Sequence, residues 1–202
     1  MDTLGLIIAH LVCDVLTLTA TYLIVIRVFD LKTYHILQSY CFALIFKCFL
    51  KSYIGVPLNP WMMQLGWAIP SGHTVALGVM YGLLLDKKTQ GYLYAFILFL
   101  IASTLIYCGY HNLLDVLIGL VCVWILVSFA DFLFRFKALY RVLTYLILSI
   151  IFMNLSYVSN HATQMQYFNY MIVLAVIERA LSSFKNYRKK LRHSSLNGVD
   201  AH

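Results

Sequence analysis

The sequence predicts an all-α fold, a polytopic bundle of about seven transmembrane helices. Hydrophobic residues make up 62% of the chain and charged residues only 11%, whereas soluble domains carry roughly a quarter charged residues. The hydrophobic residues also gather in long runs, and a helix needs ~20 apolar residues to cross the hydrocarbon core of a bilayer. We therefore expect lipid to be the solvent for most of the protein surface.

Seven apolar runs are interpreted as spans. They cover residues 4–28, 34–50, 70–86, 91–108, 112–134, 138–157 and 167–184. The first run has no basic segment before it and no small-residue cleavage pattern after it, so we expect a retained span and not a signal peptide. Together the runs form one predicted domain, residues 1–184. A basic tail follows, residues 185–202, which we expect to be cytoplasmic and partly disordered.

The basic residues predict the orientation of these spans. Apart from Lys47 and Lys51, every Lys and Arg falls at alternate junctions between the runs: Arg27, Lys32, Lys87, Lys88, Arg135, Lys137, Arg141, Arg179, Lys185, Arg188, Lys189, Lys190 and Arg192. Cytoplasmic loops of membrane proteins carry an excess of Lys and Arg. We therefore expect the N-terminus outside and the C-terminus in the cytoplasm. The outer face is then periplasmic, extracellular or organelle-lumenal.

The placement of charges and cysteines argues against two other classes of site. The net charge of +7 does not indicate a nucleic-acid partner, because the basic residues lie at the ends of apolar runs and in one C-terminal cluster. Five cysteines lie singly in apolar sequence without the paired spacing of a disulfide or zinc framework, so we interpret them as packing residues: Cys13, Cys41, Cys48, Cys108 and Cys122.

Some polar and small residues within the runs have structural interpretations. Gly78 and Gly82 form a G-x-x-x-G pair, which lets a neighbouring helix approach closely. His10 and Asp14 share a face of the first run; a metal site that they form with His35 is an alternative with no motif behind it. Four further residues are expected toward the cytoplasmic side, paired or reaching the interface: Tyr81, Asp131, Glu178 and Arg179.

Two short motifs carry most of the chemical information. Residues 70–74 read P-S-G-H-T and open the third predicted span, and His111 opens the fifth. Proline is well tolerated at a helix start, and Ser71 is a residue type that caps helices. Gly72 has no side chain to block the free backbone N–H groups of the first turn. Together with the helix dipole, these features predict an anion-binding site at the outer surface.

His111 and Asp115 are spaced i, i+4, which places both side chains on one helix face. The carboxylate can then accept the proton of one imidazole nitrogen and leave the other as a nucleophile or base. Ionisable residues at membrane depth are costly, so His73, His111 and Asp115 are functional candidates. The alternative interpretation is that each histidine only reaches the interface from a helix end.

These motifs resemble those of the type 2 phosphatidic acid phosphatase superfamily. Residues 70–73, P-S-G-H, match its second motif, and Tyr107–Gly119 is similar to the last part of its third motif. The resemblance implies that His111 is the nucleophile that forms a phosphohistidine and that Asp115 orients it. It also implies that His73 protonates the leaving group, while Ser71 and Gly72 hold phosphate oxygens.

The sequence departs from the family pattern at its basic residues. The Ser-Arg of the third motif is Thr104-Leu105 here, and the nearest copy of the first motif is Lys51 followed by Asn59-Pro60. Phosphoryl transfer needs cationic groups around the phosphate, which arginines usually supply. We therefore expect phosphate to bind the backbone N–H groups from Gly72 to Thr74, with Lys47 or Lys51 as the cation.

The resulting hypothesis is an integral membrane lipid phosphatase that acts at the extracytoplasmic face on a lipid phosphate or phospholipid. No metal or other cofactor is implied. One alternative is a lipid phosphotransferase. The sequence lacks some of the family's basic residues, and in this it resembles the sphingomyelin synthases, which act on phosphodiesters. The other is a non-enzymatic lipid transporter or scaffold with a degenerate site. The enzyme hypotheses require His73 and His111 to converge on a common space.

Overall fold

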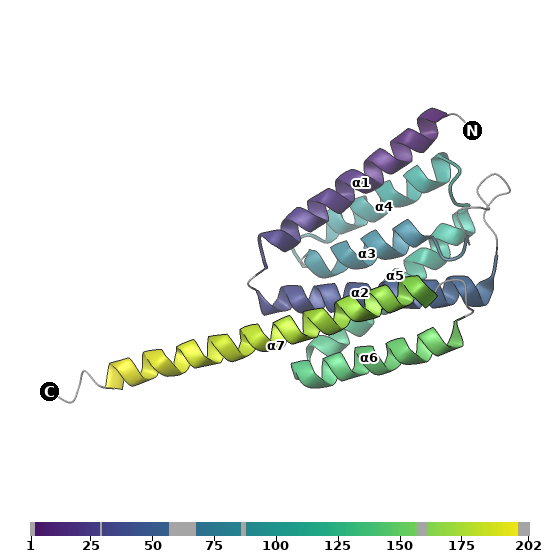
Figure 1. Cartoon of the computed structure of the whole chain (residues 1–202). Coiled ribbons are helices and arrows are strands. Elements are labelled where there is room, and N and C mark those ends of the chain that lie inside the picture. The colour runs from purple at the N-terminus through teal and green to yellow at the C-terminus, as the bar shows by residue number, and fades with distance from the viewer. Residues whose placement is uncertain (1–2, 29, 57–67, 86–87, 157–160, 198–202) are drawn as a thin grey trace.

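The structure, a computed structural model, describes residues 3–28, 30–56, 68–85, 88–156 and 161–197. Within these residues the fold is all-α, with seven helices and no strands, as the sequence predicts (Figure 1). The helices are α1 (Thr3–Val25), α2 (Leu31–Ile54), α3 (Gly72–Leu84), α4 (Gly91–Tyr107), α5 (Leu113–Phe134), α6 (Ala138–Leu155) and α7 (His161–Asn197).

Each predicted span coincides with one helix, and the largest difference is at the C-terminus. α7 has 37 residues and continues through most of the segment, residues 185–202, that was expected to be a partly disordered tail. No Gly or Pro interrupts the chain from His161 to Asn197, and the Lys and Arg residues of this segment are good helix formers. The second half of α7 therefore extends away from the other helices (Figure 1).

By length and composition, two helices among the described residues could cross a membrane, α5 and α6. Three other segments are apolar but shorter: Leu11–Val25 of α1, together with α3 and α4. The 13 residues of α3 extend for ~20 Å at 1.5 Å per residue, less than the roughly 30 Å of the hydrocarbon core. The arrangement of seven spans therefore stays a prediction.

The bundle is organised around α2. This helix packs most extensively on α7 and also contacts α3, α5 and α6, while α1 and α4 pack on α3 from the other side (Figure 1). An aromatic cluster holds the centre: the ring of Phe42 lies 5.8 Å from that of Phe129, 5.2 Å from that of Tyr145 and 5.9 Å from that of Phe152, measured between centroids. α2 thus connects the helices that carry the candidate motifs with the α6–α7 pair.

The G-x-x-x-G pair of α3 lies against its neighbours as predicted. A Cβ atom on Gly78 would lie 2.6 Å from Cγ2 of Val123 in α5, and one on Gly82 would lie 2.8 Å from Cγ2 of Val127. The Tyr94 hydroxyl of α4 donates a hydrogen bond to the Gly78 carbonyl oxygen, at 3.0 Å. Real Cβ atoms do not approach so closely, so only glycine allows α3 and α5 this separation.

Candidate active site

His111 lies in the short connection between α4 and α5, and the end of α4 determines its position. Gly109 adopts a left-handed conformation with φ 67°, which L-residues with a side chain rarely adopt. Its N–H bonds to the Ile106 carbonyl at 3.0 Å, and the Tyr110 N–H bonds to the Leu105 carbonyl at 3.0 Å. This is the Schellman arrangement of a helix C-terminus. It turns the chain so that His111 directly precedes α5.

The start of α5 then holds the Asp115 carboxylate. Asn112 is the N-cap: its side-chain oxygen accepts the Asp115 N–H at 2.9 Å, and Oδ2 of Asp115 accepts the Asn112 N–H at 3.1 Å. This reciprocal capping box fixes the carboxylate at the first turn. The same Oδ2 atom lies 3.2 Å from Nδ1 of His111. Because a carboxylate only accepts, Nδ1 donates and carries the ring proton.

The His111–Asp115 pair is removed from solvent, with His111 7% and Asp115 2% exposed. Burial lowers the pKa of His111 below its ordinary value of 6.5, while the hydrogen bond and charge of Asp115 oppose this shift. The ring is therefore neutral at neutral pH, with the Nε2 lone pair unprotonated. A neutral imidazole with its tautomer set by a carboxylate is chemically suited to act as a nucleophile or base.

A backbone hydrogen bond joins the second motif to the third. The Ser71 N–H donates to the Asp115 carbonyl oxygen at 3.1 Å, so the start of α3 is held against the start of α5. Gly72, His73 and Thr74 follow as the first three residues of α3, and the N–H groups of a first helical turn have no acceptor within the helix. The predicted anion-binding helix end therefore lies beside the His111–Asp115 pair.

The side chains of Ser71 and Thr74 are fully buried at the contact between α3 and α5. Ser71 is the N-cap residue, but its side chain makes no capping hydrogen bond; instead it accepts a bond from the Thr74 hydroxyl at 3.0 Å. A Cβ atom on Gly119 of α5 would lie 3.1 Å from Cβ of Thr74. Both side chains therefore pack on α5, and the capping role expected of Ser71 is absent.

Two lysines of α2 converge on the start of α3. A Cβ atom on Gly72 would lie 3.7 Å from Nζ of Lys47 and 3.7 Å from Nζ of Lys51. Both ammonium groups therefore lie close to the backbone N–H groups that open α3. The charge of Lys51 also acts on His111 and Asp115. Lys51 was expected at the phosphate, and Lys47 was only an alternative to it; the structure brings both together.

His73 differs from these residues in its exposure. It is the second residue of α3, next to Gly72, and its side chain is exposed, whereas those of His111 and Asp115 are buried. The convergence of the His73 and His111 rings on one space therefore stays a prediction.

The positions that depart from the family pattern are part of the core. Thr104 and Leu105 are buried, with Leu105 only 1% exposed, and the Leu105 carbonyl accepts the hydrogen bonds that end α4. Asn59-Pro60 lies outside the described residues.

Oδ1 of Asp115 is buried and has no hydrogen-bond partner within the described part of the chain.

The alternative metal site is not assembled at His35. Nε2 of His35 lies 3.2 Å from the Ala130 carbonyl oxygen in α5, and no group of three possible metal ligands occurs among the described residues. Asp14 is exposed, and the side chain of His10 lies outside the described set.

Glu178 forms an ion pair with Arg141, as expected.

Sequence reasoning missed the local features that position the pair. Gly109 and Asn112 carried a signal, since glycine after a helix and asparagine before the next one are typical end residues. Gly119 carried no such signal without knowledge of the α3–α5 contact.

Comparison of the chain with protein-family models, with curated proteins and with solved structures finds no match.

Proposed function

We propose that this chain is a multi-pass membrane protein that cleaves a lipid phosphoester, with His111 as the nucleophile. The observation that carries the proposal is the buried His111–Asp115 pair, 3.2 Å apart, beside the Lys47 and Lys51 ammonium groups at the start of α3. A neutral nucleophile next to concentrated positive charge is what attack on an anionic phosphorus requires.

The proposed reaction has two steps. Nε2 of His111 attacks phosphorus and forms a P–N bond while the P–O bond to the lipid alcohol breaks, and His73 donates a proton to the departing oxygen. Water then attacks the phosphohistidine, which releases inorganic phosphate and restores His111. Asp115 accepts the Nδ1 hydrogen bond throughout and stabilises the positive charge on the ring. A lipid alcohol in place of water in the second step would make the protein a phosphotransferase.

The lysine pair favours the phosphatase over the phosphotransferase. The absence of an arginine at position 105 pointed to a substrate of lower charge, but two lysine amines from a different helix, those of Lys47 and Lys51, lie above Gly72 where a phosphate would bind. A phosphomonoester carries up to two negative charges, and a phosphodiester carries one. Two cations and a helix N-terminus match the dianion better.

Membrane embedding is supported by the side chains that face outward. Two helices are long and apolar enough to cross a membrane. Large apolar side chains are also exposed on six of the described helices, including Leu18 (69%), Phe99 (69%), Trp124 (72%), Ile147 (56%) and Val176 (64%). Soluble monomers rarely expose extensive apolar surface. Lipid chains would remove this surface from water.

The proposed function is tested with purified protein in lipid nanodiscs. Phosphomonoester, diphosphate and phosphodiester lipids with identical acyl chains are supplied separately, and both phosphate release and new lipid products are measured. We expect phosphate release from the monoester, retained in the presence of a chelator because a histidine nucleophile needs no metal. New phosphodiester lipids without phosphate release would instead identify a phosphotransferase. Absence of turnover with every lipid would favour the transporter or scaffold.

The orientation is tested by labelling single introduced cysteines with a membrane-impermeant reagent. Thr89→Cys, before α4, should react only after the membrane is opened, and Ala162→Cys, at the start of α7, should react in intact cells or right-side-out vesicles. Both positions are exposed, while the five native cysteines are buried and serve as an internal background. Labelling of both positions from one side would contradict the proposed topology.

A further inference from the structure

A cavity lies between α6 and α7, at the end of α2 opposite Lys47 and Lys51. It is open to the surface and has a volume of about 720 Å³, within the ~300–1,000 Å³ of typical small-molecule sites. Its walls are apolar along most of their length, with Val142 and Leu146 from α6 and Ile172 and Val176 from α7. At one end, residues 179–183 add polar groups. We call this cavity the α6–α7 groove.

The polar end of the groove is positively charged. Arg179 lines it together with Ser182 and Ser183, and its guanidinium side chain is exposed. Lys137, also exposed, directly precedes the groove-lining residue Ala138 at the start of α6. Two hydroxyl groups and the cationic side chain of Arg179 beside an apolar cleft suit an anionic headgroup.

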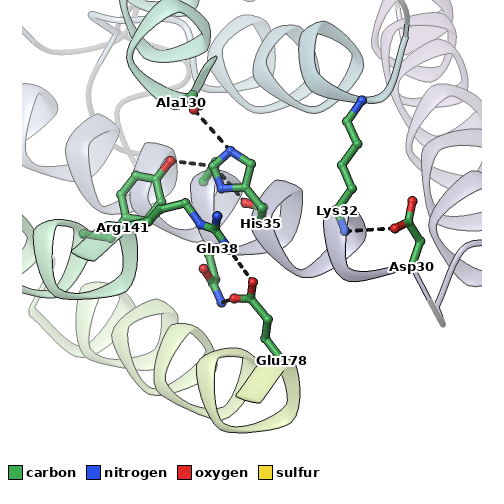
Figure 2. Close-up of polar contacts among 9 residues, drawn as sticks. Asp30, Lys32, His35, Gln38, Ala130, Arg141 and Glu178 are labelled. Carbon is green, nitrogen blue, oxygen red and sulfur yellow. Dashed lines mark hydrogen bonds and ion pairs between the residues drawn. The ribbon is translucent and has the colours of Figure 1, made fainter. Parts of the chain in front are cut away.

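The acidic residue of the groove does not oppose an anion there. Figure 2 shows the Glu178 carboxylate turned toward Gln38 and Arg141. One carboxylate oxygen accepts the Gln38 amide at 2.9 Å, and the other pairs with Arg141. Glu178 and Arg141 are buried, at 6% and 5% exposure. The negative charge of Glu178 is therefore neutralised behind the groove, and Arg179 determines the charge at its rim.

The length of the groove corresponds to one leaflet. From Ile172 to Ser183 α7 rises by ~16 Å, at 1.5 Å per residue. This is about half of the roughly 30 Å hydrocarbon core of a bilayer. An acyl chain laid against Val176 would thus extend from the bilayer centre to the polar end, where its headgroup meets Arg179.

We propose that the α6–α7 groove binds one anionic phospholipid, with its acyl chain between the two helices and its phosphate at Arg179, Ser182 and Ser183. The lipid belongs to the leaflet opposite the candidate active site, because the groove adjoins Leu31 at the start of α2 while Lys47 and Lys51 lie toward its end. The inference rests on the proposed membrane embedding but not on the proposed phosphoester cleavage.

The test is native mass spectrometry of the full chain released from detergent after equilibration with phosphatidylglycerol or with phosphatidylcholine of identical acyl chains. We expect one retained phosphatidylglycerol and little phosphatidylcholine. Arg179→Gln should weaken retention about fivefold, as expected for loss of one cation near an anionic lipid. Arg135→Gln removes an exposed charge at the end of α5 that does not line the groove, and it should leave retention unchanged.

A second pair of variants separates the groove from the general lipid shell. Val176→Trp fills the groove and should abolish retention, whereas Val173→Trp is a matched control on the same helix: Val173 is 55% exposed and does not line the cavity. Equal retention of the two lipids, or equal losses from Val176→Trp and Val173→Trp, would overturn the proposal. Lipid retention is measured without substrate, so this outcome is independent of turnover by His111.

Discussion

Replacing His111 with alanine is expected to reduce lipid phosphate release by at least ~10⁴-fold, the scale at which removal of a catalytic nucleophile reduces turnover. His111 is the only buried imidazole at the start of α3 and α5 within the described chain, and the proposed mechanism assigns the phosphoryl intermediate to it. The measurement is phosphate release in nanodiscs under single-turnover conditions. His161→Ala, at the start of α7, is the matched histidine control and should retain wild-type turnover.

Folding must be separated from chemistry in this experiment. His111 precedes α5 and its side chain packs in a buried site, so the variant is checked by size-exclusion elution and thermal melting against wild type. Near-wild-type turnover by folded His111→Ala would exclude the phosphohistidine mechanism. The transporter or scaffold would then replace the enzyme as the better hypothesis.

Asp115 is a positioning residue in this mechanism, and Asp115→Asn is expected to lower turnover by ~10²–10⁴-fold while His111 remains present. The variant should add no further loss to His111→Ala, because the two residues act as a unit. The asparagine side chain can also donate to the ring, which would favour the wrong tautomer. Additive losses would show that Asp115 acts separately from His111.

The pH dependence gives a readout that a purely structural role of Asp115 would not change. The nucleophile must be neutral, so kcat/KM rises with pH through the pKa of His111 in the free enzyme. Burial lowers this pKa below 6.5, and Asp115 opposes the shift. We therefore expect the acidic limb of the wild type below pH 6.5, and Asp115→Asn should move it to still lower pH. An unchanged limb would contradict the assignment.

The contacts within each motif could be predicted because they are local. The sequence predicted that Asp115 would face His111, and the structure places the two side chains 3.2 Å apart. The stated reason was wrong, because His111 lies before the N-cap Asn112 of α5 and does not share a helix face with Asp115. The apolar runs likewise predicted seven helices, since their lengths and periodicity determine helices without knowledge of the packing. The last helix continues to Asn197, beyond the predicted end of the seventh run at residue 184. The sequence from 185 to 197 is polar but contains no helix breaker.

Contacts between distant segments were harder to predict. Lys47 and Lys51 are also spaced i, i+4, so their shared helix face could be inferred, but not that this face lies over Gly72. Their position depends on how α2 packs against α3. The hydroxyl of Ser71 was expected to cap α3 but bonds with Thr74, because the close approach at Gly119 turns both side chains toward α5. The groove likewise depends on the separation of α6 and α7, which no local pattern contains.

Replacing Lys47 or Lys51 is expected to lower kcat/KM by an amount that depends on the charge of the substrate. Lys47→Gln and Lys51→Gln should each lower kcat/KM for a phosphomonoester lipid by ~10²-fold, the scale for one lost charge-assisted donor at a transition state. The loss should be smaller for a phosphodiester, since the attraction between a cation and a phosphate grows with the phosphate charge. Both values are measured with lipids of identical acyl chains.

The control for the lysine variants is Lys32→Gln, which removes an exposed lysine near the opposite end of the same helix. It should leave both substrates unaffected. Inorganic phosphate provides a further measurement: it should inhibit the wild type competitively and inhibit either site variant more weakly. Both results together would support the proposal that phosphate binds the two lysine side chains and the N–H groups of Gly72 to Thr74, in place of the family's arginine. Equal losses with monoester and diester would show that the lysines support the fold of α2 against α3 and do not bind phosphate.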